Sequence, residues 1–275
     1  MKLLYETDDA ERNYGFIEEL QRFGEFELIK WDDWSENGQA MLVDKLQGET
    51  VLFRARRPEA ARFLEDHGIH LVNRAEVNRI ANDKWQSYQL FLLLGVQAIP
   101  TYLLGVQAIP TYREAMEFPC IAKTADGHGG SEVWLVDKAE DIPTAASPLV
   151  FQPVVEHQSD VRAYVIGTEL VGAVKRSSKN SFKANYSLGG NIEKYVLSAA
   201  QEKDVLRIAR ALNSDYIGID FLLLEDGRHV FNEIEDPVGA RSFYETHEEN
   251  IAELLVEHMR KLEKHAPYRQ EDRPK

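Results

Sequence analysis

The sequence has little cysteine and no long apolar segment, and these absences exclude several classes of protein. Cys120 is the only cysteine among 275 residues, so the chain cannot form an internal disulfide. The longest apolar run, Leu90 to Val96, is far shorter than the roughly 18 residues that a membrane-spanning helix needs. The first residues contain no apolar segment typical of a signal peptide. These features predict a soluble, cytoplasmic protein.

Positive charge is also scarce relative to negative charge. The chain has 32 Lys and Arg against 46 Asp and Glu, a formal net charge of −14, which argues against non-specific binding to nucleic acid or to an anionic membrane. Hydrophobic residues make up 44% of the chain and charged residues 28%, the balance of a folded protein rather than a disordered one. The length is sufficient for two domains.

The first eighty residues alternate between strand-like and helix-like segments. The expected strands are Leu3–Tyr5, Phe26–Trp31, Thr50–Arg54 and Ile69–Val72. Helices are expected at Asp8–Phe23 and at Pro58–Asp66, the second with proline at its start and Gly68 just past its end. This alternation predicts a small open α/β domain over residues 1–80 with a mostly parallel sheet.

Strand-like runs dominate the second part of the chain. A helix is expected before them, opening at Asn82-Asp83 and ending near Gly95, and further helices at Ala199–Leu212 and Glu248–Lys264. The expected strands are Cys120–Thr124, Val133–Val136, Leu149–Val155, Val161–Ile166, Leu170–Val174, Tyr216–Leu224 and Val230–Glu235. The sequence thus combines an α/β domain with a larger α+β region.

Residues 93–102 are followed at once by an identical copy, residues 103–112. Solenoid repeats are longer and diverge between copies, so this duplication does not indicate a repeat architecture. Pro100 excludes one continuous helix through both copies. We expect one copy to form the connection from helix to strand and the other to be accommodated in a loop.

The strongest local argument for function comes from a predicted hairpin. Asp226-Gly227 is typical of a two-residue type I′ turn, in which both residues have positive φ. The register that follows places Asp220 opposite Glu233. It also places Gly218 opposite Glu235, and all three acids share one face. The other face is the expected core face, formed by Ile217, Ile219, Phe221, Leu223, Val230, Asn232 and Ile234.

These opposed acids have two interpretations. Directly opposed carboxylates repel each other, because their Cβ atoms are about 5 Å apart. A divalent cation between them would reverse the repulsion, and carboxylate oxygens are ligands that Mg²⁺ prefers. The hairpin therefore favours a metal site at Asp220, Glu233 and Glu235. A solvent-exposed acidic face is the alternative.

A glycine-rich loop follows the strand-like run that ends at Lys123. Backbone amides of such a loop can bind phosphate while the lysine supplies positive charge. The spacing of residues 123–131 matches neither a Walker A motif nor a dinucleotide fingerprint, and an ordinary hairpin connection is an equally good interpretation. A second candidate for anion binding is the window from Asp160 to Tyr195, where six cationic residues accompany three anionic ones.

Two other reactive side chains favour structural interpretations. His128 is interpreted as an exposed loop residue rather than as a phosphate ligand or base. Cys120, flanked by Pro119 and Ile121, is interpreted as a buried strand residue rather than a nucleophile. The sequence has no evident Ser-His-Asp arrangement and no zinc-type spacing of Cys and His.

Taken in order, these segments resemble the ATP-grasp superfamily, and most closely its RimK-type carboxylate–amine ligases. The resemblance extends from about Asn82 to about Met259. The segments that carry it are Asp83-Lys84, Pro119–Lys123, Val150–Val155, Asp160-Val161-Arg162, Lys183-Ala184-Asn185 followed by Gly189-Gly190, Gly218-Ile219-Asp220 and Asn232–Pro237. It implies an ATP-grasp domain over residues 81–275 behind the small open α/β domain. The lid subdomain would cover about 113–150 and the metal-binding subdomain about 151–265.

The resemblance also implies roles for individual residues. Contacts to the phosphates of ATP would come from Lys84, Lys123, Lys183 and Asn185. The adenine pocket and ribose would be bound by Gln152, Pro153, Val154 and Asp160. Mg²⁺, or Mn²⁺ as an alternative ion, would be held by Asp220, Glu233 and Glu235. The catalytic residues near the reacting groups would be Arg162, Arg176 and Lys183.

The chain departs from the family pattern at three places. Glu235 stands where the metal motif usually ends in asparagine, which indicates a different metal affinity or preference. Residues 236–241 differ from the usual small-residue loop, which indicates a different substrate. Pro153 replaces the glutamate that usually precedes the adenine pocket, so backbone contacts to adenine are better supported than side-chain contacts.

The function that the resemblance implies is ATP-dependent amide formation. A substrate carboxylate attacks the γ-phosphate to give an acyl phosphate and ADP, and an amine then displaces phosphate. The expected substrates are amino acids or peptides, or a protein or peptide terminus, with no nucleic acid or membrane partner; a homo-oligomer is the default assembly. The alternatives are a small-molecule kinase of the same fold and a nucleotide-binding protein with little turnover.

Overall fold

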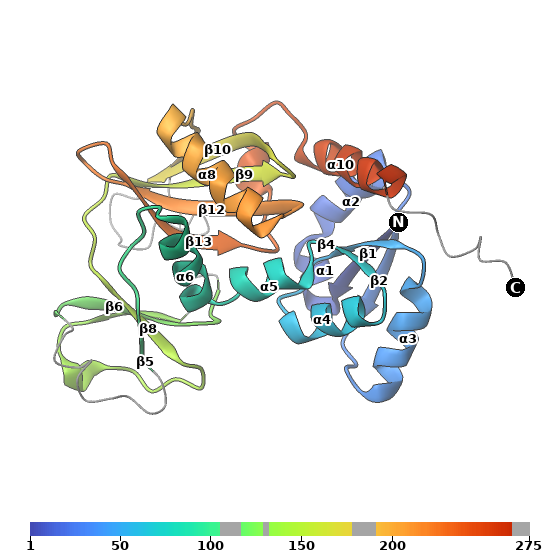
Figure 1. Ribbon diagram of the computed structural model, residues 1–275, viewed down its shortest axis with the longest axis horizontal. Coiled ribbons are helices and arrows are strands. Elements are labelled where there is room, and N and C mark those ends of the chain that lie inside the picture. The colour runs from blue at the N-terminus through green and yellow to red at the C-terminus, as the bar shows by residue number, and fades with distance from the viewer. Residues whose placement is uncertain (105–116, 129–131, 178–190, 266–275) are drawn as a thin grey trace, which may run out of the picture.

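The computed structural model describes residues 1–104, 117–128, 132–177 and 191–265 and arranges them in three sheets flanked by helices (Figure 1). A four-stranded sheet belongs to the N-terminal part of the chain and lies on the right of Figure 1. A five-stranded sheet and a second four-stranded sheet lie on the left. The chain is therefore a mixed α/β and α+β protein, as predicted.

The N-terminal sheet is fully parallel, as the alternation of strand-like and helix-like runs predicts. Its strands, in the spatial order β2-β1-β3-β4, are β1 (Lys2–Glu6), β2 (Glu27–Trp31), β3 (Thr50–Phe53) and β4 (His70–Val72). The helices of this region are α1 (Thr7–Arg12), α2 (Tyr14–Phe23), α3 (Glu36–Leu46), α4 (Pro58–Asp66) and α5 (Ala75–Ala81).

The helices of this region differ from the prediction in three respects. The single helix expected over residues 8–23 is divided at Asn13, whose backbone N–H and side-chain amide both donate to the Asp9 carbonyl and so end α1. Helix α5 was not predicted, and neither was α3. Helix α3 begins after Ser35, whose Oγ accepts a hydrogen bond from the Gly38 N–H at 3.3 Å, so a serine N-cap was the available signal.

The five-stranded sheet is antiparallel throughout. In the order β11-β10-β9-β12-β13, its strands are β9 (Ser159–Ile166), β10 (Glu169–Ser177), β11 (Asn191–Lys194), β12 (Tyr216–Leu223) and β13 (His229–Glu235). Two helices, α6 (Lys84–Leu94) and α8 (Ala199–Leu212), pack on one face, where Phe91 and Ile208 join the buried side chains of Ile217 and Ile219. Part of the opposite face packs against α2 and α10, and another part lines the site described below.

The third sheet is also antiparallel. In the order β5-β8-β6-β7, its strands are β5 (Tyr102–Leu104), β6 (Cys120–Thr124), β7 (Val133–Val136) and β8 (Leu149–Pro153), with a short 3-10 helix at Ala139–Asp141. Cys120 is buried in β6, as predicted, and burial raises the pKa of its thiol. This environment argues against a nucleophilic role.

The chain then returns to the N-terminal part of the molecule. After the short α9 (Arg241–Tyr244), α10 (Ile251–His265) lies beside α2 (Figure 1). Val256 and Met259 of α10 share one buried cluster with Ile17 of α2 and Tyr216 of β12. The hydrophobic core therefore joins the N-terminal sheet to the five-stranded sheet.

The turn of the β12–β13 hairpin differs from the predicted one. Gly227 has a φ of 83°, but Asp226 does not have positive φ, so the predicted type I′ turn is wrong. The Leu224 N–H donates to the Arg228 carbonyl, which closes a loop of three residues rather than two. As a result Leu223 pairs with His229, one residue away from the predicted register.

A β-bulge restores the predicted register farther along the hairpin. Phe221 pairs with Phe231, whereas Asp220 pairs with Glu233, so Asn232 is the extra residue on β13. Beyond the bulge Gly218 lies opposite Glu235, as predicted. The opposed acids are thus confirmed, although the turn that predicted them is not.

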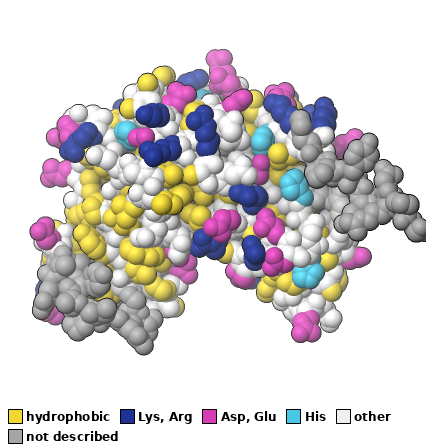
Figure 2. Space-filling view, viewed as in Figure 1, with side chains coloured by type: hydrophobic (Ala, Val, Ile, Leu, Met, Phe, Trp, Pro, Cys, Tyr) yellow, Lys and Arg dark blue, Asp and Glu magenta, His cyan; other side chains and the backbone are white. Residues whose placement is uncertain are grey.

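The surface carries no large area of one charge sign on the face shown in Figure 2. Side chains of both signs gather around the notch between the two lobes of the molecule. Within the described residues, no helix is both long and apolar enough to cross a membrane.

The two identical decapeptides take up different structures. In the first copy Leu94 ends α6, Gly95 follows with a φ of 64°, and Ile99 is buried and donates its N–H to the Phe231 carbonyl. This copy forms the helix-to-strand connection, as predicted. The second copy begins inside β5 with Leu103, and its residues 105–112, including the predicted loop, lie outside the described residues.

Deletion of residues 103–112 is expected to leave a folded chain that still binds ATP. Deleting either copy gives the same sequence, so all contacts of the first copy can be kept. Because each doubling of loop length changes the closure free energy by only about 0.6 kcal/mol, we expect the melting temperature to shift by a few degrees at most. Thermal denaturation with and without ATP checks this; an unfolded deletion variant would show that both copies are needed.

Candidate active site

A cavity of about 1100 Å³, including its open mouth, lies between the five-stranded sheet and the third sheet. It brings together all the predicted site residues that the structure describes, namely Lys84, Lys123, Gln152, Pro153, Val154, Asp160, Arg162, Arg176, Asp220, Glu233 and Glu235. The other two, Lys183 and Asn185, lie outside the described residues. Residues more than 150 positions apart in the sequence thus line one site.

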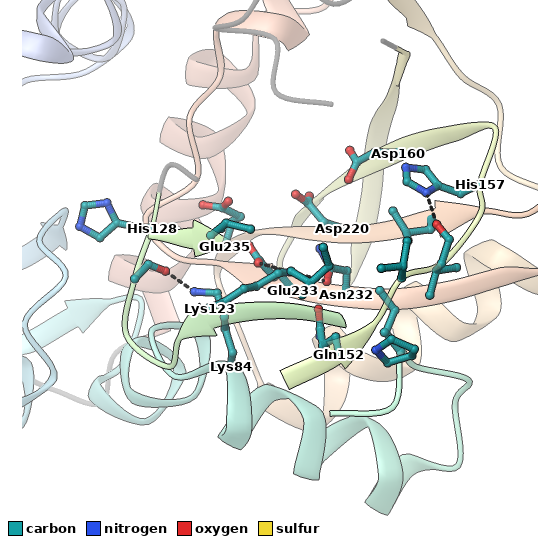
Figure 3. A pocket seen from close by; sticks show the side chains of 18 of the residues that line it. Lys84, Lys123, His128, Gln152, His157, Asp160, Asp220, Asn232, Glu233 and Glu235 are labelled. Atoms are coloured by element: carbon teal, nitrogen blue, oxygen red, sulfur yellow. Dashed lines mark hydrogen bonds and ion pairs between the residues drawn. The ribbon is translucent and has the colours of Figure 1, made fainter. Parts of the chain in front are cut away.

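One end of the cavity has apolar walls. Ile99, Ile121 and Leu222 line it, together with the segment from Gln152 to Val155 at the end of β8. Gln152 is buried, and its side-chain amide donates to the Thr101 Oγ1 at 3.0 Å, so this wall is held in place. A slot of this kind suits a flat heterocyclic ring. Figure 3 shows Gln152 and His157 at this end, away from Lys84 and His128.

Two lysines meet carboxylates at the other end (Figure 3). Lys123 lies one residue before the end of β6, and its Nζ donates to the Asn232 Oδ1 at 3.3 Å and lies 3.5 Å from the Glu233 Oε1. Lys84 begins α6, its backbone N–H donates to the Ala125 carbonyl at 2.9 Å, and its ammonium donates to the Gly127 carbonyl. The start of α6 is therefore tied to the glycine-rich loop.

The charges at this end shift one another's pKa values. Burial lowers the pKa of Lys123, Lys84 lowers it further, and Glu233 opposes both effects. Burial acts to raise the pKa of Glu233, but Lys84 and Lys123 outweigh it and the net shift is downward. Additional anions at this point would relieve the crowding of the two ammonium groups, which is the condition for binding phosphate.

Two arginines and three carboxylates form a network of ion pairs, called the ladder below, across one face of the five-stranded sheet. Its members are Arg162, Arg176, Asp160, Asp220 and Glu235. Arg162 on β9 lies opposite Asp220 on β12, and its Nε and Nη2 each donate to a different oxygen of that carboxylate at 2.7 Å. The same Nη2 donates to the Glu235 Oε1 at 2.7 Å. Arg176 on β10 donates to Asp220 at 2.8 Å and also contacts Asp160. One guanidinium thus bridges two acids of the hairpin.

Gly218 lies beside this bridge and has no space for a side chain. A Cβ atom there would lie 2.7 Å from the Val238 Cγ2 and 3.4 Å from the Arg162 Cδ. A side chain at this position would therefore clash with Val238, whereas its distance to Arg162 is that of an ordinary van der Waals contact.

Burial and pairing with arginines shift the pKa values of Asp220 and Asp160 in opposite directions. Burial acts to raise the pKa of Asp220, but Arg162 and Arg176 outweigh it and hold the pKa at about 2. Burial raises the pKa of Asp160 to about 6 despite the adjacent Arg176. Asp220 is only 4% exposed, so the interpretation of the predicted acids as a solvated face is wrong for this residue.

The carboxylate oxygens of the hairpin are the kind of ligand that a hard divalent cation prefers. Glu233 and Glu235 present carboxylate oxygens on the cavity wall, and oxygen ligands suit Mg²⁺. Both oxygens of Asp220 accept from arginines, and no group of three metal-ligating side chains is arranged together within the described ranges. The described lining has four cationic and five anionic side chains, so a polyphosphate would need additional positive charge to bind there.

Asn232 lies on a different face from the one predicted, and some residues that line the cavity were not predicted. Asn232 is expected on the core face, but the bulge brings it to the cavity beside Lys123. His157 also lines the cavity, and no sequence pattern singles it out. His128 is exposed, as predicted, and lies at the mouth. A bulge has no reliable sequence signal here, because the adjacent residues keep strand-like alternation.

Comparison with known proteins identifies relatives of this chain. The family model described as RimK-like ATP-grasp domain matches residues 81–259. The chain is 32% identical over 212 residues to a probable alpha-L-glutamate ligase of Pasteurella multocida, covering 73% of this chain and 67% of that protein. It is 29% identical over 261 residues to an uncharacterized protein of Mycoplasma genitalium, covering 90% and 88%.

Comparison with solved structures gives the same fold. A RimK domain ATP-grasp protein of Sphaerobacter thermophilus matches with a TM-score of 0.67 at 20% identity, covering 94% of this chain and 98% of that one. At this identity the match establishes the arrangement of the sheets and helices, not the chemistry of the site.

Proposed function

The chain belongs to the RimK-like ATP-grasp family and is an ATP-dependent ligase that forms C–N bonds, and we propose that the cavity between its two antiparallel sheets is where ATP, a carboxylate and an amine react. The observation that carries the proposal is the convergence of Lys84, Lys123, Glu233 and Glu235 at one end of a cavity whose other end is apolar. This polarity matches a nucleotide with its base at one end and its triphosphate at the other.

The proposal assigns a role to each part of the cavity. Adenine lies in the apolar slot at Gln152, Pro153 and Val154, and the phosphates lie against Lys84 and Lys123. Arg162 and Arg176 lie next to the phosphate end, where they are placed to stabilise negative charge on the reacting carboxylate. Lys183, Asn185 and Asp160 remain proposed contacts to the triphosphate and ribose.

The carboxylates of the hairpin complete this assignment. Glu233 and Glu235 are the proposed Mg²⁺ ligands, with Asp220 as a third only if an arginine gives up one of its oxygens. When bound, Mg²⁺ neutralises phosphate charge as the phosphoryl group is transferred. Mn²⁺ is a chemically suitable alternative.

The reaction needs no protein nucleophile. An oxygen of the substrate carboxylate bonds to the γ-phosphorus as the bond to the β-phosphate oxygen breaks, giving an acyl phosphate and ADP. The amine nitrogen then bonds to the acyl carbon as the bond from that carbon to the phosphate oxygen breaks, and the proton that the nitrogen loses ends on the released phosphate. The role of the chain's own residues is to position these groups, to exclude water and to supply fixed charge.

The proposal extends to substrates, location and domain division. Similarity to a probable alpha-L-glutamate ligase supports an amino acid as one substrate, with an amino acid, a peptide or a protein terminus as the other. A homo-oligomer in the cytoplasm, without nucleic acid or membrane partners, is part of the proposal. The proposed division is residues 1–80 and 81–275, with a lid at about 113–150 and a metal-binding part at about 151–265. The parallel sheet, which ends at Val72, supports the first boundary.

A product assay tests this function. We expect purified protein with ATP and Mg²⁺ to release ADP and phosphate only when a carboxylate and an amine are both present, and mass spectrometry to find an amide. The substrates to screen are amino acids and peptides. AMP and pyrophosphate would overturn the acyl-phosphate route, and a phosphorylated hydroxyl without an amide would identify a kinase. ATP binding without any product would identify a nucleotide-binding protein.

A further inference from the structure

Glu235 lies at a point of the five-stranded sheet where the sheet itself gives little support. It is the last residue of β13, and its pairing with Gly218 is the last pair between β12 and β13. In the sheet as the structure describes it, β13 is also an edge strand. The end of such a strand frays unless other contacts hold it. The residues that follow Glu235 therefore decide how firmly its carboxylate is placed in the cavity.

Asp236, the next residue, is buried, and both oxygens of its carboxylate accept hydrogen bonds from buried asparagines. Asn73 donates to the Oδ1 at 2.9 Å, and Asn78 donates to the Oδ2 at 3.0 Å. Each amide also donates to a backbone carbonyl, that of Tyr216 for Asn73 and that of Ala55 for Asn78. Since an amide group has two N–H donors, both groups are fully used and the carboxylate has one fixed position.

The backbone carbonyls that follow are held as well. Asn82 donates to the carbonyl of Asp236 at 2.8 Å, and Arg54 donates to that of Val238 at 2.7 Å. The carbonyl between them accepts a longer bond, at 3.4 Å, from Arg56. Three consecutive carbonyls and one carboxylate are thus held by side chains from the part of the chain that precedes α6.

Helix α5 and its two ends supply the three asparagines. Asn73 lies shortly before the helix, Asn78 lies within it and Asn82 follows it directly. The helix lies between the N-terminal sheet and β13 (Figure 1). The Oδ1 of Asn73 also accepts from the backbone N–H groups of Asp215 and Tyr216, where β12 begins. These side chains therefore fix α5, the start of β12 and the end of β13 relative to one another.

This network involves the loop in which the sequence departs from the family pattern. Residues 236–238 are buried, and the described lining of the cavity does not include them. Glu235, directly before them, does line the cavity. The loop can therefore affect the site through the position of Glu235 without touching a bound nucleotide.

We propose that Asp236 is a positioning residue for metal binding, because it fixes the end of β13 and with it the carboxylate of Glu235. The inference rests on the proposed function, in which Glu235 is a Mg²⁺ ligand. Arg162 holds the Oε1 of Glu235 at 2.7 Å, and the fixed backbone after β13 sets where the rest of that carboxylate lies. Removing a group that holds a metal ligand in place changes metal affinity about ten- to hundredfold.

The Mg²⁺ dependence of nucleotide binding tests the inference. Calorimetry measures the affinity of the full chain for a non-hydrolysable ATP analogue over a range of Mg²⁺ concentrations, and adenosine, which has no phosphates, is titrated separately. We expect Asp236→Asn to raise the Mg²⁺ concentration needed for half of the maximal affinity about tenfold or more. The affinity for adenosine should stay within twofold of the wild type, because the adenine slot is not affected.

An exchange of two side chains provides the rescue. Asn78→Asp alone places two carboxylates against each other and should weaken Mg²⁺-dependent binding at least as much as Asp236→Asn. The double variant restores one donor and one acceptor between the two positions, so its loss should be smaller than the sum of the single losses. The rescue should be partial, because the Ala55 carbonyl loses its donor. Asn82→Ser releases only the Asp236 carbonyl and should give an intermediate loss.

The matched control is Asp204→Asn. Asp204 contacts His229 at the opposite end of β13, at 3.1 Å, so its loss should change the Mg²⁺ dependence less than twofold. Thermal denaturation shows which variants fold, and Asn82→Ser decides if Asp236→Asn does not.

Three results would overturn the inference while leaving ATP binding intact. They are an unchanged Mg²⁺ dependence in the deciding variant, additive losses in the double variant, and an equal loss of affinity for adenosine and for the analogue, which would indicate a general packing defect. A wild type that binds no analogue at any Mg²⁺ concentration would instead overturn the proposed function and this inference with it.

Discussion

Asp220→Asn is expected to abolish amide formation and to lower the free energy of unfolding by about 3 kcal/mol, the scale for removing one partner of a buried ion pair. Asp220 is only 4% exposed and accepts hydrogen bonds from both Arg162 and Arg176. Asparagine cannot balance these two guanidinium charges. Urea denaturation measures the stability, and ADP release measures the activity.

The pH dependence separates this effect from a general packing defect. The pKa of Asp220 is held at about 2, below its ordinary value of 3.8, so its stabilisation is complete above pH 3.8 and is lost as the pH falls through about 2. The difference between wild type and Asp220→Asn should therefore shrink over this window. The matched control is Asp226→Asn, an exposed acid in the turn of the same hairpin, which should change neither stability nor activity. A stabilised Asp220→Asn variant that binds ATP and Mg²⁺ normally would contradict the buried-ladder account.

Lys123→Met is expected to lower the rate of ADP formation about a hundredfold or more, the scale for removing a preorganised charge from a reacting group. The side chain of Lys123 is only 12% exposed and faces Asn232 and Glu233 at the phosphate end. Methionine keeps the apolar stem and removes the charge that the phosphates would meet.

Stability should respond differently from activity in this variant. Burial lowers the pKa of Lys123, which means that the fold bears a cost for keeping the ammonium charged. We therefore expect the melting temperature of Lys123→Met to stay within a few degrees of wild type. Lys138→Met, an exposed lysine just after β7, is the matched control. Normal turnover in Lys123→Met would remove Lys123 from the proposed phosphate site.

Local sequence patterns predicted the elements better than their contacts. The α8 helix and the parallel N-terminal sheet follow from capping residues and from alternation along the chain. In the hairpin, the predicted pairing of Asp220 with Glu233 holds because two deviations cancel: the loop has one residue more than expected, and the bulge at Asn232 offsets it. A correct register here does not mean that the turn was correctly predicted.

The contacts that could not be predicted come from distant parts of the sequence. The hairpin acids were predicted to be neutralised by a metal ion. In the structure Arg162 lies between Asp220 and Glu235, because β9 is the neighbour of β12 in the sheet. Strand order is a global property that no local pattern contains. The same holds for Arg56, which lies 181 residues before its contact Pro237.

An isotope-transfer measurement tests the central claim most directly. The carboxylate substrate found in the screen is labelled with ¹⁸O in its carboxyl group and incubated with the protein, ATP, Mg²⁺ and the amine. Attack of the carboxylate on the γ-phosphate predicts that one ¹⁸O atom appears in the released inorganic phosphate for each amide formed. Amide formation with unlabelled phosphate, or with the label in AMP, would contradict the acyl-phosphate mechanism.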